Sequence, residues 1–218
     1  MKKIYTILLG AALLFAATDS FAQISVGVGY LNSTLTEAYN GKTQDKEPSN
    51  GLYMGAGFDL AILGENLKLT PGLYLSLLSS KEAGSWGKGI LNLSSKFTEV
   101  ALNAPVYVSY GMDLGHADVF IYGGPTFQYG LSSKYKVDGN IVIPGIGVVA
   151  DDGIIDNYNE MDYSRFNIYL GGGLGADLND KIRVTFGFDY GLLNLYKGKD
   201  EDTKYNRYNF KLGVGYLF

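Results

Sequence analysis

The sequence predicts an all-β fold, an eight-stranded antiparallel transmembrane β-barrel. Apolar residues alternate with small or polar residues, with a period of two, in eight separate segments. The connections between these segments alternate between short and long. Charged residues make up only 18% of the chain, below the roughly 25% of an average soluble domain. Together these patterns indicate strands whose apolar faces meet lipid.

Residues 1–22 have the three-part pattern of a secretory signal peptide. The basic start Met1-Lys2-Lys3 precedes an apolar run over 4–17, and the segment ends in Ser20-Phe21-Ala22. The run is shorter than the roughly 20 residues of a membrane-spanning helix. We therefore expect cleavage after Ala22 and a single barrel domain over 23–218, with an uncleaved N-terminal anchor as the alternative.

Charge and cysteine content exclude two classes of protein. The formal net charge of −4 argues against binding to nucleic acid, which requires a basic surface. The sequence has no cysteine, so neither a disulfide framework nor lipid attachment to cysteine can hold an exported chain.

Eight segments carry the alternation of a barrel strand. In the first, Ile24, Val26 and Val28 lie on one face, and small or polar residues lie on the other. A membrane barrel turns the apolar face outward to lipid and the polar face inward to the lumen. The fifth segment fits less well, because Phe120 and Tyr122 fall on its inner face. The predicted strands are 24–31, 52–62, 67–78, 99–112, 118–131, 165–178, 181–192 and 207–218.

The connections predict which end of the barrel is which. Short hairpins are expected at 63–66, 114–117 and 179–180. Longer connections are expected at 36–50, 79–97, 132–163 and 195–205. This alternation is typical of short periplasmic turns and long extracellular loops.

The inward-facing charges predict a salt-bridge network that plugs the narrow lumen. Eight strands enclose a space just wide enough for side chains, and an unpaired buried charge is costly. Hairpin register places Asp177 opposite Arg183 and Asp189 opposite Lys211. The predicted network consists of Asp59, Lys68, Asp177, Arg183, Asp189, Arg207 and Lys211.

Two further pairings follow from the short turns. Across the 63–66 turn, Asp59 and Lys68 come within direct or diagonal reach. Counting residues from the 114–117 turn places Asp113 opposite Asp118 at the periplasmic mouth, where water can relieve the repulsion between two carboxylates.

No segment carries a recognisable catalytic, cofactor or metal motif. The glycine-rich run 171–175 lacks the following helix that a dinucleotide site requires. The only histidine, His116, lies in a predicted periplasmic turn, away from the outer rim. We therefore expect no catalytic residues, no cofactor and no bound metal. For the 132–163 loop we expect a solvated segment whose flanking strands continue above the membrane, with calcium binding by its carboxylates as the alternative. These carboxylates do not follow an EF-hand pattern; they are Asp151, Asp152, Asp156, Glu160 and Asp162.

Two segments resemble those of a known family. The C-terminal pattern resembles the barrel-assembly signal of outer-membrane proteins; it consists of Phe210, Leu212, Val214, Tyr216 and Phe218. The segment 99–108, followed by Tyr122-Gly123-Gly124-Pro125, is similar to the porin-family outer membrane protein beta-barrel domain of Gram-negative bacteria. Because the sequence ends at Phe218, it resembles the short OmpX type rather than the two-domain OmpA arrangement.

The resemblance implies a location in the outer membrane, contact with its lipid and passage through the barrel-assembly machinery. We expect a non-enzymatic scaffold that presents extracellular loops for adhesion, partner binding or envelope stability, with 132–163 as the segment that meets a partner. A narrow channel for small solutes is the alternative, and a barrel enzyme is a third hypothesis.

Overall fold

The computed structural model describes residues 22–63, 66–86, 91–143, 147–200 and 202–218, so the predicted signal peptide lies outside the described residues except for Ala22. The elements are β1 (Ala22–Tyr39), β2 (Lys42–Leu63), β3 (Leu67–Trp86), β4 (Leu91–Asp113), β5 (Ala117–Ile143), β6 (Gly147–Asp156), α2 (Asn157–Glu160), β7 (Phe166–Leu178), β8 (Ile182–Gly191) and β9 (Thr203–Leu217). Within the described residues, no helix is long and apolar enough to cross a lipid bilayer.

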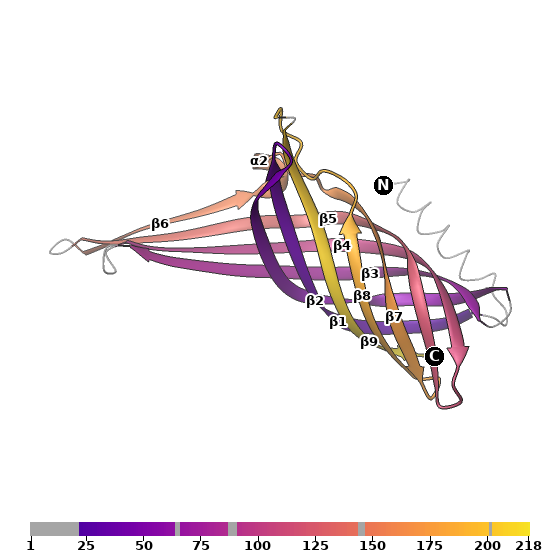
Figure 1. The fold of residues 1–218 in the computed structure, drawn as a ribbon. Coiled ribbons are helices and arrows are strands. Elements are labelled where there is room, and N and C mark those ends of the chain that lie inside the picture. Colours follow the sequence, from indigo (N-terminus) through magenta and orange to yellow (C-terminus); the bar gives the residue numbers. More distant parts are fainter. Residues whose placement is uncertain (1–21, 64–65, 87–90, 144–146, 201) are drawn as a thin grey trace, which may run out of the picture.

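Eight antiparallel strands close into a ring (Figure 1). Each strand pairs with its neighbour in sequence, β5 pairs with β7, and β1 pairs with β9 to close the barrel. The predicted barrel is confirmed. A ninth strand, β6, was not predicted. It pairs with the distal part of β5 and lies outside the ring.

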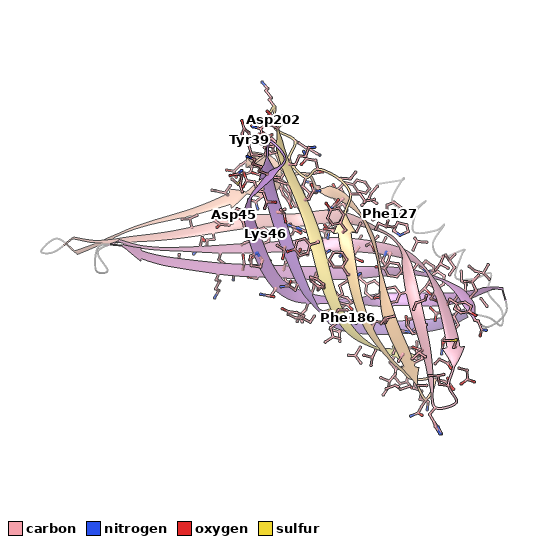
Figure 2. All side chains as sticks on the ribbon, in the orientation of Figure 1. Tyr39, Asp45, Lys46, Phe127, Phe186 and Asp202 are labelled. Atoms are coloured by element: carbon pink, nitrogen blue, oxygen red, sulfur yellow. The ribbon has the colours of Figure 1, made fainter. Side chains whose placement is uncertain are left out.

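The alternating faces point as predicted. Outward apolar side chains such as Val26, Leu73 and Phe186 are 49%, 54% and 54% exposed, whereas the inward Asp59 and Asp189 are 3% and 2% exposed. Figure 2 shows the labelled Phe127 and Phe186 on the outside of the ring. A water-soluble protein buries apolar side chains and exposes polar ones, and this barrel does the reverse.

At the end where long loops were predicted, the strands continue instead. The predicted loop 36–50 is a hairpin whose turn is only Asn40-Gly41, both with positive φ, and Tyr39 pairs directly with Lys42. Two residues with φ above zero are what a type I′ hairpin turn requires. The longer connection predicted at 36–50 is therefore strand except for this turn, because the hydrogen-bonded ladder continues after the apolar alternation ends.

The sheet splits at this end into two parts. Pairing between β2 and β3 stops at Asn50 and Ser79, beyond which each strand continues with its other neighbour. The distal halves of β3, β4 and β5, together with β6, form a long arm that points away from the end of β1, β2 and β9 (Figure 1). Most of the predicted loops 79–97 and 132–163 is therefore strand.

Candidate functional site: an occluded lumen below an open groove

The lumen near the short turns is crossed by a carboxylate–guanidinium cluster. Arg183 on β8 lies opposite Asp177 on β7 and donates to both of its carboxylate oxygens at 2.7 Å. The same guanidinium donates to Asp59 on β2 at 2.7 and 3.2 Å. Lys68 is 4.0 Å from Asp59, and Thr70 donates to Asp59 at 2.8 Å. Four members of the predicted network therefore meet at one level, with Arg183 at its centre.

A second tier lies in the middle of the barrel. Nζ of Lys211 is 2.5 Å from Oδ2 of Asp189 and donates to the hydroxyl of Tyr107 at 2.8 Å. The predicted register was wrong by two residues, because Asp189 lies opposite Asn209. A shift of two keeps both side chains on the inner face, so Lys211 still reaches Asp189 diagonally.

The upper tier joins Arg207 on β9 to Glu99 on β4. The guanidinium forms two hydrogen bonds with the carboxylate, one of them 3.2 Å from Nη2 to Oε2. Arg207 is 4% exposed and Glu99 is 1% exposed. Arg207 Nη2 also donates to the hydroxyl of Tyr163 at 2.9 Å. Burial raises the pKa of Tyr163, which keeps its hydroxyl neutral.

The period of two places Glu99 on the inner face of its predicted strand, opposite in face to Val100, but the sequence did not predict its partner. Its partner is not in a neighbouring hairpin, because β4 and β9 are four strands apart in either direction round the ring. The available signal was Arg207, an inward charge for which no hairpin supplied a partner.

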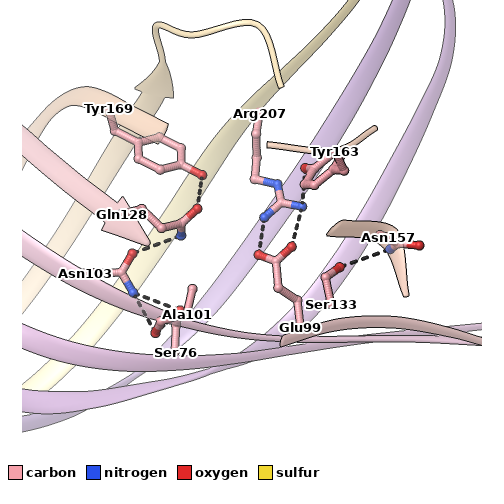
Figure 3. Close-up of polar contacts among 10 residues, drawn as sticks. All are labelled: Ser76, Glu99, Ala101, Asn103, Gln128, Ser133, Asn157, Tyr163, Tyr169 and Arg207. Atoms are coloured by element: carbon pink, nitrogen blue, oxygen red, sulfur yellow. Dashed lines mark hydrogen bonds and ion pairs between the residues drawn. The ribbon is translucent and has the colours of Figure 1, made fainter. Parts of the chain in front are cut away.

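Uncharged side chains extend the same blockage (Figure 3). The Tyr169 hydroxyl donates to Gln128 at 3.1 Å, Gln128 donates to Asn103 at 2.9 Å, and Asn103 donates to Ser76 at 2.9 Å. This chain of hydrogen bonds runs from β7 through β5 and β4 to β3. A cavity of about 130 Å³ remains in the lumen, and the rings of Tyr53, Tyr74, Tyr107 and Tyr122 line it.

A larger hollow lies above the upper tier. It has a volume of about 310 Å³ and is enclosed by the end of β1, β2 and β9 on one side and the arm on the other. We call it the mouth groove. Its lining residues are Ser33, Leu35, Glu37, Asp45, Glu47, Ser49, Phe97, Tyr135, Val137, Ile155, Asn157, Met161, Tyr163, Tyr205 and Arg207.

The remaining candidate residues lie in helix caps and turns. Asp156 accepts from the backbone N–H of Tyr158 and caps α2, and Glu160 accepts from the backbone N–H of Asp156. His116 lies in the turn between β4 and β5. In the described part of the chain, no group of three or more His, Cys, Asp or Glu is arranged to hold a metal ion. The side chains of Asp151 and Asp152 lie outside the described residues.

The family model described as "Outer membrane protein beta-barrel domain" matches residues 4–218. This chain belongs to that family. The protein is accordingly located in the outer membrane of a Gram-negative bacterium, as the sequence resemblance implied. No curated protein sequence matches the chain.

Solved barrels similar to this family member come from several bacteria. Ail, the attachment invasion locus protein of Yersinia pestis, in complex with the heparin analogue sucrose octasulfate, is 12% identical, with a TM-score of 0.41 over 91% of this chain and 99% of that chain. Neisserial surface protein A is 14% identical, with a TM-score of 0.41 over 88% and 97%. The outer membrane protease OmpT from Escherichia coli is 13% identical, with a TM-score of 0.34 over 93% and 99%.

Proposed function

We propose that this protein is a closed, non-enzymatic anchor in the outer membrane that presents its β3–β6 arm to a partner outside the cell. The observation that carries the proposal is the ion pair of Arg207 and Glu99, which spans the lumen between strands on opposite sides of the ring. With the Lys211 and Arg183 tiers below it, this pair occupies the path that a solute would need. The inward charges are therefore used for closure.

The arm supplies a surface for recognition. Strand β6 is the last strand of the sheet and pairs with β5 alone among the described strands. An unpaired strand edge offers a row of N–H and C=O groups to an extended segment of another chain. Such a strand does not help to close the barrel, so its presence supports a role in binding.

Export and assembly belong to the same proposal. Cleavage after Ala22 would leave the barrel domain 23–218, and the outward row that ends at Phe218 would be recognised by the barrel-assembly machinery. Lipid then contacts the outward apolar residues.

Conductance in planar bilayers tests closure. The proposal expects no steady single-channel conductance from the purified protein. A steady conductance that changes in Asp189→Ala or Lys211→Ala would support the narrow channel instead. Turnover of a lipid or peptide substrate that disappears on mutation of an outer-rim residue would contradict the non-enzymatic part of the proposal.

A shortened arm tests presentation. Val137 lies opposite Gly153, so an Asn-Gly turn in place of 138–152 closes the β5–β6 hairpin early. A matched control shortens the β1–β2 hairpin, where Leu35 lies opposite Glu47, by replacing 36–46 with Asn-Gly. Bacteria displaying each form are compared for adherence to immobilised matrix proteins and glycans. We expect adherence to be lost with the short arm and kept in the control; equal adherence would contradict the proposal.

A further inference from the structure

We propose that the mouth groove binds an organic cation that carries an apolar body, such as an arylalkyl amine. The inference goes beyond the partner of the arm, because it concerns a small ligand held between the two parts of the split sheet. Its volume of about 310 Å³ is at the lower end of the range for small-molecule pockets. It is too small to hold a folded domain.

One wall of the mouth groove is acidic. Glu37 on β1 and Asp45 on β2 lie directly opposite each other, and both line the groove. Like charges in directly opposite positions on a sheet destabilise it. Glu47, two residues along β2, lines the same wall. A cation placed against this wall would relieve the repulsion between Glu37 and Asp45.

The facing wall is apolar and aromatic. Phe97 on β4 lies opposite Tyr135 on β5, and Val137 and Ile155 continue the same wall. Aromatic faces attract cations, and an organic cation also brings an apolar body that these side chains can cover. The two walls thus match the two parts of the proposed ligand.

The groove also contains a buried polar group without a partner. Ser33 lines the groove and is 2% exposed, and its hydroxyl has no hydrogen-bond partner. A buried polar group without a hydrogen bond costs free energy. Ser33 is four residues from Glu37 along β1, so its hydroxyl would meet the ligand away from the ammonium group. Arg207 is the one cation among the lining residues given above, and Glu99 balances its charge.

The carboxylates of the acidic wall also act on a neighbouring hydroxyl. Tyr205 on β9 lies opposite Glu37 and lines the groove. Burial raises the pKa of the Tyr205 hydroxyl, and the negative charge of Glu37 raises it further. The negative charge of Glu37 that acts on Tyr205 would also attract a bound cation.

The chemistry of the walls favours an organic cation over a metal ion. Calcium takes six to eight oxygen ligands. Within the described ranges, no three His, Cys, Asp or Glu side chains are arranged for a metal. The apolar wall would also give a metal ion nothing to bind.

The test is NMR titration of the full mature barrel in zwitterionic nanodiscs with 3-phenylpropylamine, which is protonated at pH 7. The neutral isostere 3-phenylpropanol separates recognition of the charge from partition into lipid. We expect saturable shifts at Ser33, Val137 and Ile155, with the amine binding about tenfold more tightly than the alcohol. Each exposed carboxylate contributes only a few-fold because water screens it.

A pair of matched variants locates the charge. Glu37→Gln/Asp45→Asn should weaken binding of the amine about tenfold. The control Asp113→Asn/Asp180→Asn removes the same charge from the opposite end of the barrel and should leave binding unchanged. The proposal is overturned by equal affinity for amine and alcohol, by equal effects of the two double variants, or by shifts that do not saturate. The comparison of amine with alcohol uses the unmodified protein and so does not depend on folding of a variant.

Discussion

Arg207 and Glu99 form a buried ion pair between β9 and β4, two strands on opposite sides of the ring. Tyr163, which follows α2, accepts a hydrogen bond from Arg207 at 2.9 Å. The pair therefore ties the barrel wall, across its own lumen, to the segment that connects the arm with β7. Arg207 and Tyr163 also line the mouth groove. The same contacts therefore close the lumen and form the end of the groove that faces it.

Removing one partner should be far worse than removing both. Glu99→Leu leaves the guanidinium of Arg207 buried without its carboxylate, which costs about 3–5 kcal/mol. The double variant Glu99→Leu/Arg207→Met should recover most of this loss, because two apolar side chains need no pairing and only the Tyr163 hydroxyl loses its donor. Urea unfolding in lipid vesicles measures both, and additive losses in the double variant would contradict a paired role. The exposed Lys204→Met should change stability by less than about 0.5 kcal/mol.

Gly175 should be necessary because the ring of Phe120 leaves no room for a side chain there. A Cβ at this position would overlap Cζ of Phe120, whose ring also lies under Arg183. Gly175→Ala should therefore cost about 1–3 kcal/mol. In Gly175→Ala/Phe120→Leu the two losses should be less than additive, since the shorter side chain removes the overlap.

Gly153 on β6 provides the matched control for this substitution. A Cβ there would meet nothing within 4 Å, so Gly153→Ala should be close to neutral. The free energy of unfolding in urea is measured for the wild type and four variants: Gly175→Ala, Phe120→Leu, Gly175→Ala/Phe120→Leu and Gly153→Ala. Equal destabilisation at 153 and 175 would show that the loss comes from the strand backbone and not from the ring.

The sequence predicted which face each residue occupies, because lipid and lumen impose a period of two on every strand. It also predicted the Asp177 and Arg183 pair, since the tight turn at Asn179 and Asp180, both with positive φ, fixes the register of that hairpin. Between β8 and β9 the connection is longer and fixes no register. The predicted pairing of Asp189 was accordingly two residues off.

Contacts across the lumen could not be predicted in this way. Counting residues on each side of a hairpin turn relates only neighbouring strands, whereas Glu99 and Arg207 are on strands that share no hairpin. The arm was predicted only in part, as strands flanking 132–163 that continue above the membrane, and its extent was missed for a different reason. Outside the membrane both faces of a strand meet water, so apolar alternation fades while the hydrogen-bonded ladder continues from Ser132 to Ile143.

Two carboxylates at the short-turn mouth should make stability depend on pH. Asp118 lies opposite Asp113, next to the short turn between β4 and β5. The pair is closer to that turn than the outward-facing Tyr110 of β4. Burial raises the pKa of Asp118, and repulsion from Asp113 raises it further. A raised pKa means that the protonated acid favours the folded state. This contribution is present at low pH and is lost as pH rises through the folded-state pKa, above the ordinary value of about 3.9.

Asp118→Asn should therefore stabilise the barrel at pH 7, by about 0.2–1 kcal/mol, the usual size of a cross-strand charge effect. Near pH 3 the acid is already protonated and the gain should vanish. Urea midpoints at the two pH values give the comparison. A gain of equal size at both would mean that the substitution acts through packing or hydrogen bonding and not through charge.

The outward row at the end of β9 should matter more for assembly than for stability. Phe210, Leu212, Val214, Tyr216 and Phe218 are 42%, 54%, 50%, 46% and 73% exposed, so the last ring buries least against the protein. Phe218→Ala should therefore leave the purified, refolded barrel close to wild-type stability while lowering the amount of folded protein in cells several-fold. Heat-modifiable gel mobility of outer-membrane fractions measures the folded amount. Phe166→Ala removes an outward ring from β7 that is 42% exposed, outside this row, and should leave the folded amount unchanged. If both variants reduced it equally, the row would act through contact with lipid and not as a signal to the assembly machinery.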